Sequence, residues 1–148
     1  MDTYGTINQV LVHLFNEIWA LEEKAIISDE FKDLTNNDMH IIEAVGPGDG
    51  NNMSTIARKL RITVGSLTTS MNSLVNKKYA TRSRSELDRR VVNICLTEKG
   101  IAAYRHHEIF HQQMTEAVLA QLKQNEIDIL LHSLEKLSDF FRKYDNEK

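Results

Sequence analysis

Apolar residues recur at helical spacing near both ends of the chain. From residue 7 to residue 21, and again from residue 127 to residue 141, they fall at positions i, i+3, i+4 and i+7 with polar residues between them. This spacing predicts one helix at each place. Three further helices are expected from about Thr35, from residue 53 and after Thr63, because a good N-terminal capping side chain precedes periodic apolar residues at each of these points.

Two of these helix ends carry specific local signals. Asp38 follows Thr35 at the third helical position, which is close to a capping box. Clustered glycines and a proline at residues 46–50 then end that helix. The third helix, capped by Asn51 or Asn52, and the fourth helix are joined by a turn at residues 61–63, and this predicts a helix-turn-helix.

The pattern changes from helical to extended between residues 80 and 100. Two short runs, near Ala80–Arg84 and Val91–Leu96, flank a polar tip, and Thr97 then caps a long helix that continues to about Leu122. Two such runs around a tip predict a β-hairpin. The expected order is α-α-α-α-β-β-α-α, a mainly α fold with a small β-hairpin wing. We expect a single chain-long domain over 1–148, with a winged helix-turn-helix lobe at 35–100.

The fourth helix is predicted to have one apolar face and one small polar face. At 100° per residue the apolar positions Val64, Leu67, Met71 and Leu74 lie together, whereas Ser66, Thr68, Thr69 and Asn72 lie opposite or beside that face. Short polar side chains let a helix approach base edges in the major groove of DNA. A helix that is merely solvated would usually carry lysine and glutamate at these positions.

Charge is distributed unevenly along the sequence. The net charge is −3, yet residues 54–100 contain ten Lys or Arg and three acidic residues, a net of +7, so the remainder carries −10. Cations are thus concentrated in the segment that contains the wing, as expected of a face that binds nucleic acid. The expected DNA-binding residues are Arg58, Ser66, Thr68, Thr69, Asn72, Lys77, Arg82, Arg84, Asp88, Arg89 and Arg90.

Different roles are expected within that set. Arg58 and Lys77 flank the polar face and suit phosphate contacts. The wing arginines suit a narrow minor groove. Asp88 is placed to hold Arg90 by a charge-assisted hydrogen bond, and its alternative role is that of an ordinary turn aspartate.

The wing residues resemble those of the MarR family of bacterial regulators. The family pattern Asp-x-Arg followed by Leu-Thr-x-x-Gly occurs here as residues 88–90 and 96–100, and the helix order agrees over essentially the whole chain. One departure is Lys78, where the family usually has glycine. A lysine must therefore adopt the backbone conformation of the turn that ends the helix. Segments around residues 11–23, 31–40, 64–72 and 88–92 are most similar to the branch that represses fatty-acid biosynthesis.

This resemblance implies a homodimer that binds a palindromic operator in double-stranded DNA. The dimerisation helices would span 5–28 and 101–145. It also implies long-chain acyl-acyl carrier protein as a corepressor, although most relatives respond to a ligand in the opposite sense. The apolar candidates for a ligand pocket are Phe15, Trp19, Met39 and Ile42, together with His40. Ordinary core packing is the alternative interpretation of these residues.

Histidines supply the main alternative function. His40, His107 and His111, with Glu22 or Glu23, suit a zinc-responsive repressor of the same family. The leading expectation includes no metal and no cofactor, and no arrangement of side chains predicts an enzyme. The single cysteine, Cys95, is expected to be a small core residue rather than a redox sensor. Three features lead us to expect a cytoplasmic protein: there is only one cysteine, no leader pattern is visible, and no apolar run is long enough to span a membrane.

Overall fold

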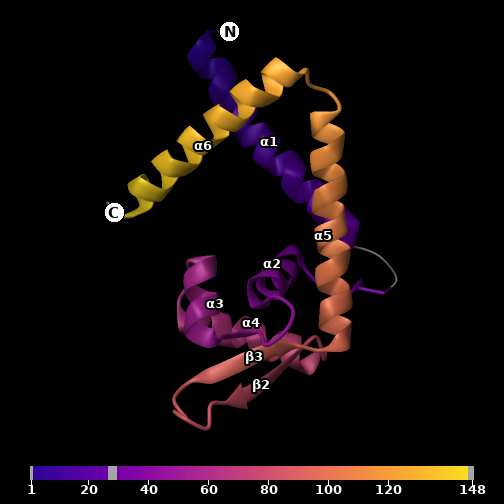
Figure 1. Ribbon diagram of the computed structural model, residues 1–148, viewed down its shortest axis with the longest axis vertical. Helices are drawn as coiled ribbons and strands as arrows, with labels where there is room; N and C mark the ends of the chain where they lie inside the picture. Colours follow the sequence, from indigo (N-terminus) through magenta and orange to yellow (C-terminus); the bar gives the residue numbers. More distant parts are fainter. Residues whose placement is uncertain (1, 27–29, 147–148) are drawn as a thin grey trace. The chain divides into compact units, whose positions relative to one another are not determined.

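The computed structural model describes residues 2–26 and 30–146 (Figure 1). Its helices are α1 (Thr3–Ile26), α2 (Asn36–Val45), α3 (Met53–Leu60), α4 (Val64–Asn76), α5 (Glu98–Leu119) and α6 (Gln124–Asn146). The strands are β1 (Asn51–Asn52), β2 (Ala80–Arg84) and β3 (Val92–Leu96). The expected helices and both wing strands are confirmed. Residues 27 and 28 of the predicted dimerisation segment lie outside the described residues.

Local capping explains where the short helices begin. Thr35 and Asp38 form the predicted capping box at α2, and each side chain accepts a hydrogen bond from the other residue's backbone N–H. Asn52, rather than Asn51, caps α3, and Thr63 caps α4. Lys78 has a φ of 69° and so takes the left-handed conformation that its position required.

The sheet has a third strand that the sequence pattern did not predict. β3 lies between β1 and β2, and it is antiparallel to both. Asn51 pairs with Ile94, while Ala80 pairs with Leu96 at the base of the wing. This third strand ties the loop before α3 to the wing. Figure 1 shows α2, α3 and α4 together beside the strands, with the β2–β3 hairpin extending past them.

A continuous apolar core holds these elements together. Side chains of Ile42, Ile56, Leu67, Leu74 and Ile94 have no exposed surface. Burying each large aliphatic side chain contributes on the order of 2 kcal/mol to folding. The core therefore fixes α4 against α3 and the sheet, and so determines which side of α4 faces solvent.

The described residues form two compact units that divide within α5, between Phe110 and His111. The first unit contains the helix-turn-helix, the wing and α1. The second contains the remainder of α5 and α6, and no described residue of α6 is buried. Among the described helices, none is both long enough and apolar enough to cross a membrane.

Candidate nucleic-acid interface

The turn between α3 and α4 is built by local backbone hydrogen bonds. Arg61 takes the left-handed conformation with φ 55°, and its N–H donates to the end of α3. The N–H of Ile62 donates to the carbonyl of Ala57. Thr63 then starts α4 by accepting from the N–H of Ser66 at 3.1 Å. These bonds set the angle at which α4 leaves α3, so α4 is presented as the second helix of a helix-turn-helix.

The two faces of α4 are largely as predicted. Leu67, Met71 and Leu74 are fully buried, whereas the outer polar side chains, Ser66, Thr68, Thr69 and Asn72, are exposed. One expectation was wrong: Val64 is 46% exposed because it stands in the first turn of α4, beyond the edge of the core. Thr68 donates its hydroxyl to the Val64 carbonyl at 2.8 Å, so its oxygen remains as an acceptor.

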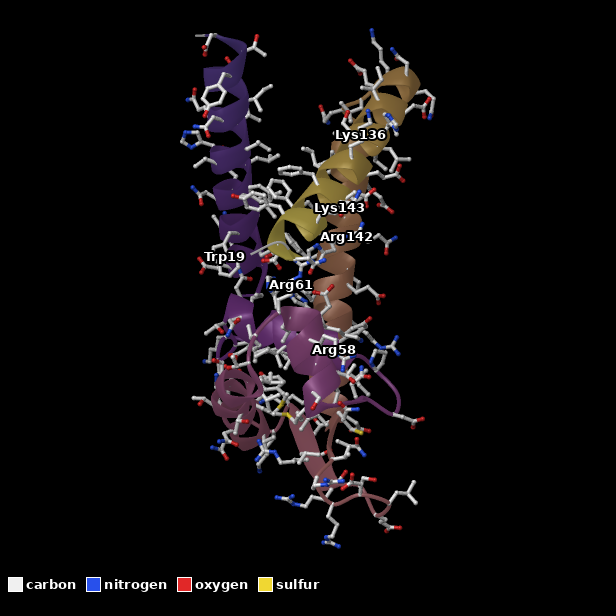
Figure 2. All side chains as sticks on the ribbon, turned by 90° about the vertical axis from the view of Figure 1, so that its left-hand side faces the viewer. Trp19, Arg58, Arg61, Lys136, Arg142 and Lys143 are labelled. Atoms are coloured by element: carbon white, nitrogen blue, oxygen red, sulfur yellow. The ribbon has the colours of Figure 1, made fainter. Side chains whose placement is uncertain are left out.

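An open cavity with a volume of about 520 Å³ lies between α3, the start of α4 and the wing. It is lined by Asn52, Met53, Ser54, Thr55, Arg58, Val64, Thr68, Arg82, Arg84, Arg90, Val91 and Val92. Four of these residues are arginines, and none of the lining residues is acidic. Figure 2 labels Arg58 on α3 and shows nitrogen-tipped side chains around the wing. A cavity with this lining attracts phosphate groups, because guanidinium groups bind phosphate oxygens with matched geometry.

Helix α3 adds to this surface in a way that sequence reasoning missed. Ser54 and Thr55 stand at its first turn, and both line the cavity. The Thr55 N–H already donates to the Asn52 side chain at 2.8 Å, so the helix start is pinned to β1. The capping asparagine was a detectable signal, but the pairing of β1 with β3 that turns this helix start toward the wing was not.

The predicted contact between Asp88 and Arg90 is present at the tip of the wing. Arg90 donates from Nε to Asp88 Oδ1 and from Nη2 to Oδ2, each at 3.1 Å, and its backbone N–H also donates to Oδ1. These bonds from Arg90 hold the pKa of Asp88 below its ordinary value. Arg84 donates from Nη1 to the carbonyl of Arg89 at 2.8 Å, and this bond links β2 to the far side of the wing tip. The wing therefore presents arginines in fixed directions.

Two predicted DNA-binding cations have different surroundings from those expected. The Nζ of Lys77 donates to the Asp33 carbonyl at 2.6 Å and to the buried carboxylate of Asp38 at 3.2 Å. Its ammonium group thereby neutralises a buried charge within the chain. Arg82 donates from Nη2 to Asn72 Oδ1 at 2.7 Å, so it faces α4 instead of extending freely from the wing.

The predicted ligand-pocket residues have contrasting environments. Met39 and Ile42 are buried in the core, which agrees with the alternative interpretation of ordinary packing. Phe15 and Trp19 are 66% and 46% exposed. The ring of Trp19 meets that of His40 edge to face, with centroids 5.7 Å apart. The ring contact joins Trp19 and His40 of the predicted set, and Met39 and Ile42 share the hydrophobic core.

Acidic and histidine side chains from three helices meet in the first unit. His40 Nε2 lies 3.3 Å from Glu22 Oε2, and donor atoms of Glu22 and His107 lie within 4.8 Å of each other. Glu22 and His107 are buried, with exposed fractions of 6% and 4%. His111 follows His107 by one turn of α5. Nitrogen and carboxylate oxygen donors of this kind suit zinc.

Cys95 is half-buried on β3, with its thiol donating to the Asp49 carbonyl at 3.1 Å. It lies at the edge of the core rather than within it. Its contact with the loop before β1 supports a structural role.

Comparison with known proteins adds independent evidence. A family model described as transcriptional regulator SarA/Rot matches residues 23–106. The structure of FabT from Streptococcus pneumoniae in complex with DNA is 36% identical in sequence, with a TM-score of 0.91, and the alignment covers 95% of this chain and 98% of that one. The HTH-type transcriptional regulator YpoP of Bacillus subtilis is 29% identical over 115 residues, which cover 78% of this chain and 74% of that protein.

A mutant MarR from E. coli, complexed with operator DNA, shares the fold with a TM-score of 0.69 at 21% identity, covering 93% of this chain and 99% of that one. The predicted resemblance to MarR regulators, and to the fatty-acid-biosynthesis repressor FabT in particular, is thus confirmed. These relatives are DNA-binding regulators and not enzymes. The chain therefore belongs to the SarA/Rot family of transcriptional regulators, and it has the winged helix-turn-helix fold of the MarR proteins.

Proposed function

We propose that this chain represses transcription by binding a palindromic operator as a homodimer. The observation that carries the proposal is the exposed small polar face of α4 beside a cavity lined by four arginines. In this arrangement α4 enters the major groove, while Arg58 and the wing arginines contact the flanking backbone or the minor groove. The DNA complex of FabT, which is 36% identical, supports this mode of binding.

Exposed apolar faces on two helices support the homodimer. On α1, large apolar residues including Ile7, Val10 and Leu14 are roughly half exposed, and only Glu22 and Ile26 are buried among the described residues of that helix. On α6, Ile129, Leu131, Leu134, Leu137, Phe140 and Phe141 are all at least 40% exposed. Lys136, Arg142 and Lys143 occupy other positions of α6 (Figure 2). Apolar surface on this scale is usually covered by a partner, here a second copy of the chain.

The dimer can be tested by sedimentation equilibrium, since one chain has a mass of 17.0 kDa. We expect twice that mass. Leu137→Glu should shift the protein toward the single-chain mass, because a carboxylate would be buried in an apolar interface. Lys136→Glu, one residue away, is the matched control and should leave the dimer intact. A single-chain mass for the unaltered protein would contradict the proposal.

We further propose that the repressed genes are those of fatty-acid biosynthesis, with long-chain acyl-acyl carrier protein as corepressor. The support is the likeness to FabT over 95% of the chain. A ligand strengthens repression only if it binds the DNA-competent state better than the alternative state. The test is binding to duplexes taken upstream of fatty-acid biosynthesis genes, with and without long-chain acyl-acyl carrier protein. Stronger binding supports the proposal, and an equal effect of carrier protein lacking the acyl chain contradicts it.

A zinc-responsive repressor is the second candidate, favoured by the meeting of Glu22, His40 and His107 in the first unit. The predicted ligand His111 follows His107 by one turn of α5 and belongs to the second unit. In this hypothesis zinc titrated into the protein is bound, and operator affinity changes with it. His107→Ala should abolish zinc binding measured by calorimetry, while His132→Ala on α6 serves as the surface-histidine control. Zinc binding that is equally strong in His107→Ala would exclude this site.

A further inference from the structure

A side-chain hydrogen bond between the wing and the outer face of α4 fixes the direction of an amide. Arg82 on β2 donates from Nη2 to Asn72 Oδ1 at 2.7 Å. Both residues are exposed, and Arg82 also lines the cavity between α3, the start of α4 and the wing. The bond therefore lies at the surface that the proposed function places against DNA, and the inference below rests on that placement.

The chemistry of arginine decides which way the amide points. A guanidinium group has only donors, so the Asn72 atom that it contacts must be the carbonyl oxygen. The two N–H bonds of the Asn72 amide are then directed away from Arg82. The residue consequently offers a hydrogen-bond donor to whatever approaches the outer face of α4.

Thr68, one turn earlier on the same face, has the opposite polarity. Its hydroxyl hydrogen is used in the 2.8 Å bond to the Val64 carbonyl, so the oxygen lone pairs are what it can offer. The face of α4 thus presents an acceptor at Thr68 and a donor at Asn72. In the major groove, such a pair distinguishes base edges, because cytosine presents a donor where guanine, adenine N7 and thymine O4 present acceptors.

We propose that Arg82 is a positioning residue for base recognition: it holds the Asn72 amide so that α4 donates to a base acceptor and rejects cytosine on the contacted strand. Lysine does not replace arginine in this role. The planar guanidinium can donate to Asn72 from one nitrogen and to a phosphate from another, whereas an ammonium group is a point charge on a flexible stem. Arg82 therefore contributes to specificity as well as to charge.

The experiment uses an operator obtained by selection from random duplexes, together with a scrambled duplex of the same length. Fluorescence anisotropy gives the affinity of the unaltered protein, Arg82→Lys, Asn72→Ala and the double variant for both duplexes. We expect Arg82→Lys to lower the ratio of operator to scrambled affinity about tenfold, the scale of one lost base contact. Affinity for the scrambled duplex should change by less than about twofold, because the charge is kept.

Two further readouts separate positioning from simple charge. One operator position at which the unaltered protein rejects cytosine should become tolerant of it in both Arg82→Lys and Asn72→Ala. The double variant should lose no more specificity than Asn72→Ala alone, since both changes remove the same contact. Arg84→Lys is the matched control: its guanidinium bonds to Arg89 within the wing, so any loss should be equal for both duplexes.

The inference is overturned if Arg82→Lys weakens both duplexes equally, or if the two single losses multiply in the double variant. It also fails if cytosine is still rejected at every operator position in Arg82→Lys. A different result would refute the proposed DNA face itself: Arg58→Ala and Arg84→Ala, which each remove a cation, would then bind both duplexes as tightly as the unaltered protein. Thermal unfolding of each variant confirms that the exposed substitutions leave the fold intact.

Discussion

Gly50 allows a sharp test of the strand that joins the helix-turn-helix to the wing. Its φ is +71°, and a Cβ built on it would lie 1.9 Å from the carbonyl oxygen of Ile94 on β3. Gly48 also has a positive φ, +81°, but a Cβ there meets no atom within 4 Å. Gly50→Ala and Gly48→Ala therefore share the cost of the left-handed backbone and differ in the clash with β3.

The magnitudes follow from these distances. A left-handed alanine costs about 1 kcal/mol, and this applies at both positions. Ordinary contact begins at 3.4 Å, so Gly50→Ala must also move β1 away from β3 by about 1.5 Å, the difference between 3.4 and 1.9 Å. Backbone atoms cannot rotate aside, and the pairing of Asn51 and Asn52 with β3 would be lost. At about 1 kcal/mol for each hydrogen bond, the total for Gly50→Ala is roughly 3 kcal/mol.

The assay is urea unfolding followed by circular dichroism, at one fixed chain concentration because a dimer's stability depends on concentration. We expect the free energy of unfolding to fall by roughly 3 kcal/mol in Gly50→Ala and by about 1 kcal/mol in Gly48→Ala. Losses that agree within about 0.5 kcal/mol would refute the reasoning, since the clash with Ile94 would then have no cost.

Three further substitutions probe the wing, the α4 terminus and the cavity. Asp88→Asn should lower operator affinity about tenfold by releasing Arg90, yet change the free energy of unfolding by less than about 0.5 kcal/mol because the ion pair is exposed; an unchanged affinity would show that the orientation of Arg90 is irrelevant. Tyr79→Phe removes a 2.6 Å hydrogen bond to Asp33 and should cost about 1 kcal/mol in urea unfolding. That bond lowers the pKa of Asp33, so the cost should be present above about pH 4 and vanish as the pH falls through the folded-state pKa; a cost that grows in acid would contradict this. Arg58→Ala should reduce the slope of log affinity against log salt by about one, and an unchanged slope would mean that Arg58 contacts no phosphate.

The parts of the fold that could be predicted from sequence depend on short-range chemistry. The capping box of Thr35 and Asp38 involves residues three apart, and its bonds form inside a single helical turn. The wing was predictable for the same reason, because Asp88 and Arg90 are two residues apart within one tight turn. Local rules placed these elements to within a few residues.

The parts that could not be predicted depend on contacts between distant segments. β1 has only two residues, and its strand character comes from pairing with β3 some forty residues later. Lys77 ends the recognition helix beside the expected DNA face, yet a buried carboxylate at Asp38 binds it. The bond between Arg82 and Asn72 likewise depends on the angle between the hairpin and α4, which no sequence pattern specifies.

The central claim is that two copies of this chain bind a palindromic operator through α4 and the wing. The most direct measurement is the stoichiometry and affinity of the protein on a selected palindrome, compared with a duplex in which one half-site is scrambled. We predict two chains on each palindrome and an affinity at least about a hundredfold lower on the half-scrambled duplex, because a two-fold dimer loses the base contacts of one recognition helix. One chain on each duplex, with equal affinity for both, would contradict the account.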